Sequence, residues 1–515
     1  MRQILPKLHI PVSSWMIFPV ACALVVIGAK IWMIAQYGSP TPFWDQWDAE
    51  GAILYPKYFD GTLSFSDLIA PHSEHRILIT RLWLLLLLEL GGYWNPTLQM
   101  LANTAILGAF VALLITAFRP ILDGASWIAF VLFSTVIFAL PFGWENTLAG
   151  FQSQWYFVLL FSIAGLLAII EATAFTPRWW TALLLLLISY FSLASGALTV
   201  AAAIAVCVMQ FIAGRRSGPR ELLALAILAA VMVAMVLYTP VIAGHSPLKA
   251  HSIEQFLRAL MEIASWPATT GHKGILILIL GGALVHAPSL LVGIHVIGLR
   301  PPLADRRWLL VALTGWAVLQ AASIAYGRAV GATSPRYLDV FAVALTVNYA
   351  CLLYLLIASE VRLRKYLAFG ATALWLLAVL FGMTKGFFTL YLPQMEEKRA
   401  TGHAQTQNLH AYLDTGDIAT LENKPFLAIP YPSPQRLAMI VSQPVIRAIL
   451  PPALVGEASA ARAQQRGLAR ITGRPVETLK TYALRWGVLL IPTGFTLFLV
   501  GLTMQLRRKP ETTSS

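Results

Sequence analysis

Acidic and basic side chains gather in one polar stretch of this chain, residues 37–96, which separates two apolar runs. Asp45, Asp48 and Glu50 come directly after the first apolar run, and a His-Ser-Glu-His-Arg segment follows at 72–76. A carboxylate beside apolar walls can act as a general base toward a hydroxyl or an amine. Arginine and histidine can hold a phosphate leaving group. The pattern predicts acid–base chemistry on a phosphorylated substrate, with Asp45 or Asp48 as the base and Glu50 as a secondary acidic residue.

The histidine-containing segment leaves other roles open. His72, Glu74 and His75 could form part of a divalent-metal site with one of the aspartates, although short H-x-E-H spacing alone is a weak signal. A divalent ion is the one cofactor that the sequence suggests. Alternatively, these three side chains are hydrated surface residues, and Asp45 and Asp48 cap a loop helix.

Two further polar loops add candidates for contacts with an acceptor. Loop 141–153 contains Glu145 and Gln152 among aromatic residues. Glu145 and Gln152 are secondary candidates for contacts with the acceptor. Loop 241–273 contributes histidines such as His245, but their spacing matches no recognisable motif.

Loop 326–337 carries two arginines, Arg328 and Arg336, and Arg336 is followed by Tyr337. These arginines fall on the side of the membrane where positive residues are under-represented, so topology does not explain them. We expect both, together with Arg76 and Tyr337, to hold the phosphate of a donor substrate.

The elements that must position these residues are membrane spans. The chain of 515 residues is 58% hydrophobic and 12% charged, with a mean hydropathy of +0.69, whereas soluble domains carry about 25% charged residues. This composition excludes a soluble enzyme. The net charge of +13 is spread over short loops and not over a basic domain, which argues against nucleic acid as a partner. Cys22, Cys207 and Cys351 each lie in an apolar run, so neither a disulfide framework nor a cysteine zinc site is indicated.

Apolar runs long enough to consider as spans recur along the chain. They lie at 13–36, 77–92, 97–118, 125–140, 154–171, 179–194, 197–213, 221–240, 274–299, 308–325, 338–358, 366–385 and 486–506. Run 77–92 is short and carries Arg81 and Glu89, so we interpret it as an amphipathic helix on the outer surface; an ordinary short span is the alternative. Without it, the arginine-rich loops and both termini share the cytoplasmic side. The sequence therefore predicts an all-α polytopic protein of about twelve (11–13) transmembrane helices.

This topology predicts a bacterial inner-membrane protein whose site faces the periplasm and whose termini are both cytoplasmic. The expected units are a transmembrane domain at 1–385 with periplasmic loops 37–96, 141–153, 241–273 and 326–337, a small helical periplasmic module at 386–485, a last span at 486–506 and a cytoplasmic tail at 507–515. The module should contain a charged helical stretch at 394–399, a proline-rich run at 429–434 and a helix near 457–470. Because its apolar content is modest, we expect it to depend on the membrane domain for folding.

The order of elements over residues 13–360 resembles the GT-C superfamily of polyprenyl-phosphate-sugar-dependent membrane glycosyltransferases. It is most similar to the bacterial branch related to protein O-mannosyltransferases and lipid A aminoarabinose transferase. Members have an acidic motif after the first span, then a glycine, then a basic motif that opens a juxtamembrane helix. Asp45-Gln46-Trp47-Asp48, Gly61 and the segment 72–76 stand in those places, and Gln46 departs from the acidic partner of the family.

The resemblance implies a fold of GT-C type, a polyprenyl-phosphate-linked sugar as donor, inversion at the sugar and an aspartate as general base. It implies a glycan, lipid or protein of the cell envelope as acceptor, and membrane lipids as surroundings. The alternatives are a transporter or flippase for a lipid-linked saccharide, a glycan polymerase or ligase, or a non-catalytic scaffold that presents 386–485. A transporter should carry charges deep within its spans, whereas Lys30 and Glu171 are expected near span ends, where their side chains can reach the surface.

Overall fold

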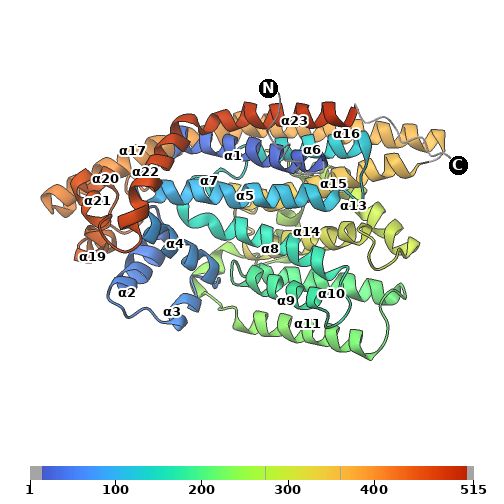
Figure 1. Ribbon diagram of the computed structural model, residues 1–515, viewed down its shortest axis with the longest axis horizontal. Coiled ribbons are helices and arrows are strands. Elements are labelled where there is room, and N and C mark those ends of the chain that lie inside the picture. The colour runs from blue at the N-terminus through green and yellow to red at the C-terminus, as the bar shows by residue number, and fades with distance from the viewer. Residues whose placement is uncertain (1–13, 273, 360, 507–515) are drawn as a thin grey trace, which may run out of the picture.

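The computed structural model of the chain describes residues 14–272, 274–359 and 361–506. Throughout these residues the secondary structure is helical, and no β-strand is formed. The helices form an elongated bundle in which most axes follow the long axis of the molecule (Figure 1).

Nine helices of the described chain are long and apolar enough to cross a membrane. In chain order they are α1 (Ile17–Tyr37), α5 (Pro96–Phe118), the helix Gly150–Ile169 that includes α8 (Ser153–Ile169), α11 (Pro219–Tyr238), α13 (Ile275–Leu299), α14 (Arg307–Gly327), α15 (Pro335–Ala358), and the continuous helices Arg362–Thr415 and Ala469–Leu506. Two shorter apolar helices, α6 (Gly124–Ala139) and α10 (Gly196–Ile212), and α9 (Pro177–Tyr190) lie in the same bundle (Figure 1). The chain is thus a helical multi-pass membrane protein, and the expected total of about twelve spans stays a prediction.

Helix α4 (Leu78–Gly91) has 14 residues and is not among the helices long enough to span. The last turns of α1 pack against the first turns of α5, since Ile34 and Tyr37 share a hydrophobic cluster with Met100 and Leu101. The chain between α1 and α5 therefore leaves and rejoins the bundle at the same end. Helix α4 lies at that end and packs against α22 (Ala469–Trp486) (Figure 1).

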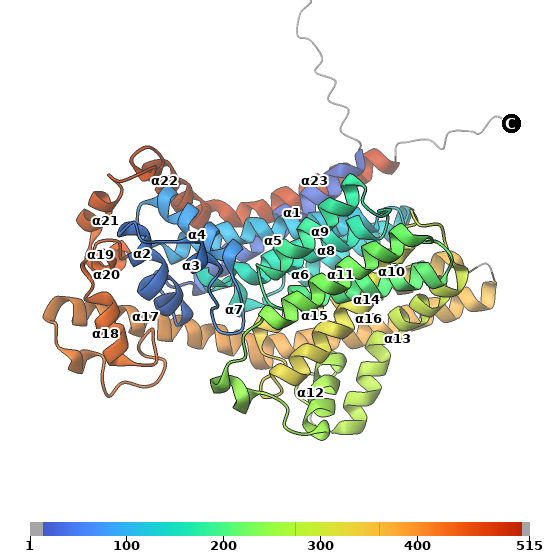
Figure 2. The ribbon, with the colours of Figure 1, turned by 90° about the horizontal axis from the view of Figure 1, so that it is seen from below.

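We call this end of the bundle the module end, because segment 386–485 also lies there (Figure 2). Helix α16 (Arg362–Gly386) continues without a break into α17 (Leu392–Thr415), which contains the predicted helical stretch 394–399. The short helices α18 (Pro434–Val441), α19 (Pro444–Arg447) and α20 (Pro452–Val455) follow. The single helix predicted near 457–470 is wrong: α21 (Glu457–Ala463) ends before α22 begins at Ala469. Gly467, between them, has a positive φ of 49°, which a helix does not allow.

Segment 386–485 shares one hydrophobic core with the first loop. The π-helical turn η2 (Trp47–Leu54), α2 (Tyr55–Phe59) and α4 contribute the first-loop side, and α17 to α20 contribute the other. The rings of Trp47 and Trp94, both fully buried, meet at 5.0 Å in this core. The first loop thus supplies a large part of the apolar core against which the module packs.

Two charged side chains that were expected near span ends differ in their surroundings. Lys30 is 1% exposed, and its Nζ donates to the carbonyl of Leu140 at 2.8 Å. The buried carboxyl group of Asp339 acts on Lys30 electrostatically. The prediction that Lys30 snorkels is therefore wrong, because its amino group is held inside the bundle. Glu171 lies just after the end of α8, near a span end as expected, and its side chain pairs with Arg178 and Arg306.

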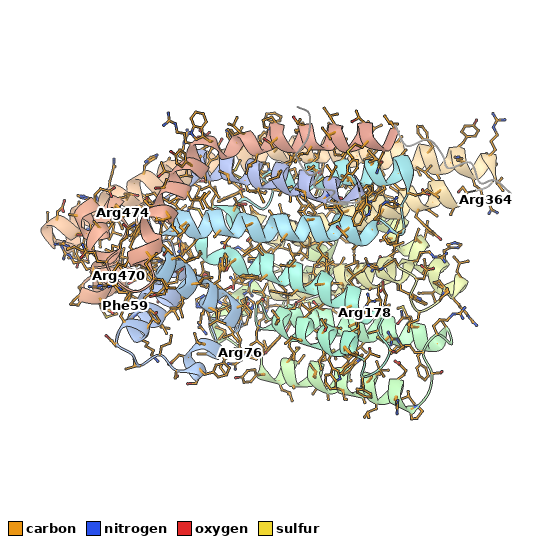
Figure 3. All side chains as sticks on the ribbon, in the orientation of Figure 1. Phe59, Arg76, Arg178, Arg364, Arg470 and Arg474 are labelled. Atoms are coloured by element: carbon orange, nitrogen blue, oxygen red, sulfur yellow. The ribbon has the colours of Figure 1, made fainter. Side chains whose placement is uncertain are left out.

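Arginines of the connecting loops gather away from the module end. Arg216 donates to the carbonyls of Ile169 and Ala172 at 2.7 Å and pairs with Glu221 at 2.9 Å, so it satisfies the last carbonyls of α8. Arg364 lies at the far tip of the long axis from the module end (Figure 3).

Candidate functional site

Charged residues from several parts of the chain meet at the module end. We call them the charged cluster: Asp45, His72, Glu74, His75, Glu145, His245, Arg328 and Arg336. They come from the first loop, from α7 (Trp144–Thr147), from the 3-10 turn η4 (Ala243–Leu248), from the end of α14 (Arg328) and from the first turn of α15 (Arg336). All but His245 are residues that the sequence pattern singled out as site residues.

A tight turn presents the histidines and Glu74. The amide of His72 donates to the carbonyl of His75 at 2.8 Å, and the amide of His75 donates to the carbonyl of His72 at 3.0 Å. Ser73, inside the turn, has a φ of +50°. The His72 ring packs edge-on against Phe151 at 5.0 Å. These contacts fix the ring of His72 on one side of the turn.

Glu74 is the anionic centre of the turn. Its carboxylate pairs with Arg328, with Nδ1 of His245 at 2.6 Å and with Nε2 of His75 at 3.9 Å. Partial burial would raise the pKa of Glu74, but His75, Arg328 and His245 together hold it below its ordinary value. Glu74 is therefore ionised near neutral pH, and the charge of Arg328 is largely matched inside the cluster.

His75 differs from the other basic groups of the cluster. Burial lowers the pKa of His75 to about 4, and the nearby His72, Arg328 and His245 act in the same direction against the attraction of Glu74. The imidazole of His75 is thus neutral near neutral pH.

Asp45 is the accessible carboxylate of the cluster. Its side chain is 52% exposed, and its Oδ2 lies 3.9 Å from Nε2 of His72. Partial enclosure would raise the pKa of Asp45, but the interactions with His72, Arg336 and His75 outweigh it and lower the pKa. A carboxylate that is ionised, accessible and close to a histidine has the geometry of a general base.

Arg336 and Glu145 form the other half of the cluster. Nε of Arg336 donates to Oε2 of Glu145 at 2.7 Å. The next residue, Asn146, donates to the main-chain oxygen of Arg336 at 2.9 Å and to Oδ2 of Asp339 at 2.8 Å. Any side chain at Gly143 would meet the carboxyl group of Asp339, so a glycine there lets α7 approach α15 closely. The loop that carries Glu145 is therefore anchored to α15.

Two adjoining hollows lie beside the cluster, and Glu145 lines one of them. One, of about 340 Å³, is lined by polar groups that include Glu145, Thr269, His272 and Gln394. The other, of about 420 Å³, is mainly apolar and lies between α12 (Ile253–Ser265), α13, α14 and α15. Trp266 lines both hollows. Together they could accept a molecule with a polar head and an apolar tail.

Side chains of the module bind the carboxylate of Asp48, which does not face the charged cluster. Nε and one terminal nitrogen of Arg436 donate to its Oδ1 at 2.7 and 2.5 Å, and the Tyr431 hydroxyl donates to its Oδ2 at 2.7 Å. The amide of Trp44 donates to the carbonyl of Pro430 at 2.8 Å. Asp48 and Trp44 thus fasten the segment around Asp45 to the module.

Glu50 is fully buried, so it does not reach an acceptor in this structure. Its carboxyl group accepts from Gln46 at 3.0 Å and from Tyr55 and Gln99 at 2.7 Å. Burial raises the pKa of Glu50 to about 7, although the donors Tyr55, Gln99 and Gln46 act in the opposite direction. Glu50 belongs to the interior that supports the loop.

Three other predicted site residues lie outside the charged cluster. Arg76 stacks on the Tyr238 ring at 3.4 Å and donates to the Tyr238 carbonyl at 3.0 Å. Tyr337 is 7% exposed, and its ring packs edge-on against Trp155 at 5.6 Å. Gln152 accepts from the side chain of Gln154 at 3.1 Å. Arg76 and Tyr337 are therefore held by contacts within the protein.

Within the described residues, no group of three or more histidine, cysteine, aspartate or glutamate side chains has the arrangement of a metal site. Glu74 is instead taken by Arg328 and His245. The predicted divalent ion at His72, Glu74 and His75 thus stays a prediction that this geometry does not support.

Sequence reasoning missed the residues that hold the site in place. Arg436 and Tyr431 lie more than 380 positions after Asp48 along the chain, and no local pattern connects them. His245 stood in a loop whose histidine spacing matched no motif. The proline-rich run 429–434, which contains Tyr431, is the one local signal, since it predicts a rigid exposed segment.

Comparison of the chain with protein-family models, with curated proteins and with solved structures finds no match. The geometry of the charged cluster and of the two hollows therefore carries the functional argument.

Proposed function

We propose that this protein is a membrane glycosyltransferase that moves a sugar from a polyprenyl-phosphate donor to a cell-envelope acceptor, with inversion and with Asp45 as the general base. One observation carries the proposal: an accessible carboxylate stands beside a histidine and an arginine, at the end of a membrane bundle that has an amphipathic pair of hollows. The resemblance in the order of elements to GT-C enzymes agrees with it.

The chemistry uses the charged cluster as follows. Asp45 removes the proton from an acceptor hydroxyl, and the acceptor oxygen attacks the anomeric carbon from the face opposite the phosphate. The bond between the anomeric carbon and the phosphate oxygen breaks, and its electron pair leaves with the polyprenyl phosphate. Arg336 offsets the developing charge on that phosphate, because a guanidinium can bind two phosphate oxygens at once.

The hollows suit the two ends of such a donor. A sugar binds well to aromatic rings together with carboxylate, amide and hydroxyl groups, and the polar hollow offers Trp266, Glu145, Gln394 and Thr269. The apolar hollow lies between membrane helices, where an isoprenoid chain would replace lipid. Trp266, shared by both, would lie at the junction of sugar phosphate and chain.

We further propose the topology that this function needs. About twelve spans, with α4 lying on the bilayer surface, put the charged cluster in the periplasm of a bacterial inner membrane and both termini in the cytoplasm. The position of Arg364 at the opposite tip of the long axis from the module end supports this orientation (Figure 3).

The test is transfer from a radiolabelled polyprenyl-phosphate sugar by membranes that contain the protein. We expect Asp45→Asn to reduce transfer by about a hundred- to ten-thousand-fold, the usual effect of removing a general base. Asp414→Asn is a matched control, because Asp414 is also exposed and also paired with a histidine, His410 at 2.9 Å. Equal transfer by wild type and Asp45→Asn would refute the assignment of the base.

A transporter or flippase is the second candidate, since the buried Lys30 and Asp339 lie within spans, where charges often mark a transport path. A flippase would move the labelled lipid across the bilayer without forming a glycosylated product. Polymerase, ligase and scaffold functions have no separate observation in their favour.

A further inference from the structure

Helix α22 carries an exposed apolar stripe. Ile471, Pro475, Leu479, Tyr482 and Trp486 recur at spacings of three and four residues, so they lie on one face of the helix. Ile471 is 76% exposed, Leu479 is 69% exposed and Tyr482 is 60% exposed. Large apolar side chains aligned in this way normally lie against another surface.

A basic stripe runs beside the apolar one. It consists of Arg470, Arg474 and Arg485, all of which are exposed. Each directly precedes a residue of the apolar stripe, so the two stripes are offset around the helix by the rotation of one residue. Arg470 and Arg474 form no ion pair or hydrogen bond with any residue that the structure describes. Segment 457–486 contains six arginine or lysine residues and two glutamates. The remaining face of α22, which includes Ala469 and Gly473, is buried.

The position of α22 fits the boundary of a bilayer. At its first turn, the Thr472 hydroxyl donates to the carbonyl of Leu90 at 2.9 Å, a few residues before the span α5 begins at Pro96. At its last turn, α22 continues into the span α23 (Leu490–Leu506), where Gly487 abuts Ile31 of α1. Figure 1 shows α22 turned away from the direction of α23. The first turn of α22 is therefore tied to α4, close to the start of α5, and its last turn is tied to α1 and α23.

We propose that α22 lies in the headgroup layer of the membrane and binds anionic phospholipids. The apolar stripe reaches the upper acyl region, and Arg470, Arg474 and Arg485 contact phosphate groups of the lipids. Figure 3 shows Arg470 and Arg474 at the module end, opposite Arg364. Since positive residues are under-represented on the outer side of a membrane, topology alone does not account for these arginines. This inference does not depend on glycosyl transfer.

The experiment uses the full-length protein in nanodiscs that hold one copy each. A polarity-sensitive fluorophore is attached to Leu479→Cys; the native cysteines Cys22, Cys207 and Cys351 are buried, so labelling is selective. We expect a lipid-like emission that shifts further to the blue as phosphatidylglycerol replaces phosphatidylcholine. Each arginine near an anionic surface contributes about fivefold in lipid binding.

Substitution of Arg470→Gln and Arg474→Gln together should therefore raise the phosphatidylglycerol fraction needed for half the shift by an order of magnitude or remove the dependence on it. Arg399→Gln, in an exposed pair with Glu396 on α17, is the control and should change nothing. Water-like emission in every disc would overturn the proposal. A wild-type emission that does not change with the phosphatidylglycerol fraction would also overturn it, and so would an emission that becomes lipid-like only when two copies share a disc.

Discussion

The contact between Asp48 and Arg436 allows a test of whether Asp48 positions the segment that carries Asp45 or is itself the base. Replacing Arg436 with alanine removes both donors to Oδ1 of Asp48 and leaves the hydrogen bond from Tyr431. Arg436 and Asp48 have side chains that are 44% and 32% exposed. Exposed pairs of this kind stabilise a protein by about 0.2–1 kcal/mol. The melting temperature should therefore fall by less than about 2 °C in a chain of this size.

The effect on the reaction should be larger than the effect on stability. Without Arg436, the segment that carries Asp45 is free to shift, and a displacement of about 1 Å at a catalytic group can cost about a hundredfold in rate. We expect Arg436→Ala to lower transfer by about ten- to a hundredfold at saturating donor. Arg399→Ala is the control, because Arg399 is 46% exposed and pairs with one carboxylate on the same module. It should keep wild-type transfer.

Substitution of the carboxylate completes the test. Asp48→Asn keeps an acceptor oxygen for Arg436, so its transfer should fall less than that of Arg436→Ala, whereas Asp45→Asn should be inactive. If Asp48 is instead the base, Asp48→Asn will be inactive and Arg436→Ala will retain transfer. Transfer within twofold of wild type in Arg436→Ala would refute the positioning argument.

Two further predictions concern buried charges. Because the pKa of Glu50 is raised to about 7 in the folded protein, the folded state binds a proton that the unfolded state releases above about pH 4.5. The stability contribution of Glu50 is thus fully present below about pH 4.5 and is lost as pH rises to about 7, a change of about 3 kcal/mol. Glu50→Gln should abolish this slope in melting curves recorded between pH 4.5 and 8, and an unchanged slope would assign it to another group. Lys30→Met should destabilise the protein, because the buried Asp339 then loses the opposite charge that acts on it. The loss should stay below about 3–5 kcal/mol, the cost of removing one partner of a direct buried ion pair, and Lys30→Met with Asp339→Asn should recover most of it. Melting of both variants beside Lys57→Met, an exposed lysine, checks this; equal melting of Lys30→Met and wild type would contradict it.

The fold was largely predictable because apolar period and length determine helices in a membrane protein. The proximity of Asp45 to His72 could also be predicted, since both belong to one loop. The partners of Asp48 could not be predicted, because they depend on how the module folds back over that loop. The burial of acidic side chains could not be predicted either. Glu50 and Asp48 look alike in the sequence, and only the packing around Glu50 makes it an interior group.

The core shared by the first loop and the module has a consequence for synthesis. Trp47, Leu84 and Trp94 are made early, whereas Leu437 and Ile440, which pack in the same cluster, follow more than 300 residues later. At about 5–20 residues per second, the early half waits on the order of 15–60 s for its partner. During this interval its apolar side chains must be covered by lipid or by a chaperone. A chain released before its module is complete would display them permanently, so such fragments should be targets for proteolysis at the membrane.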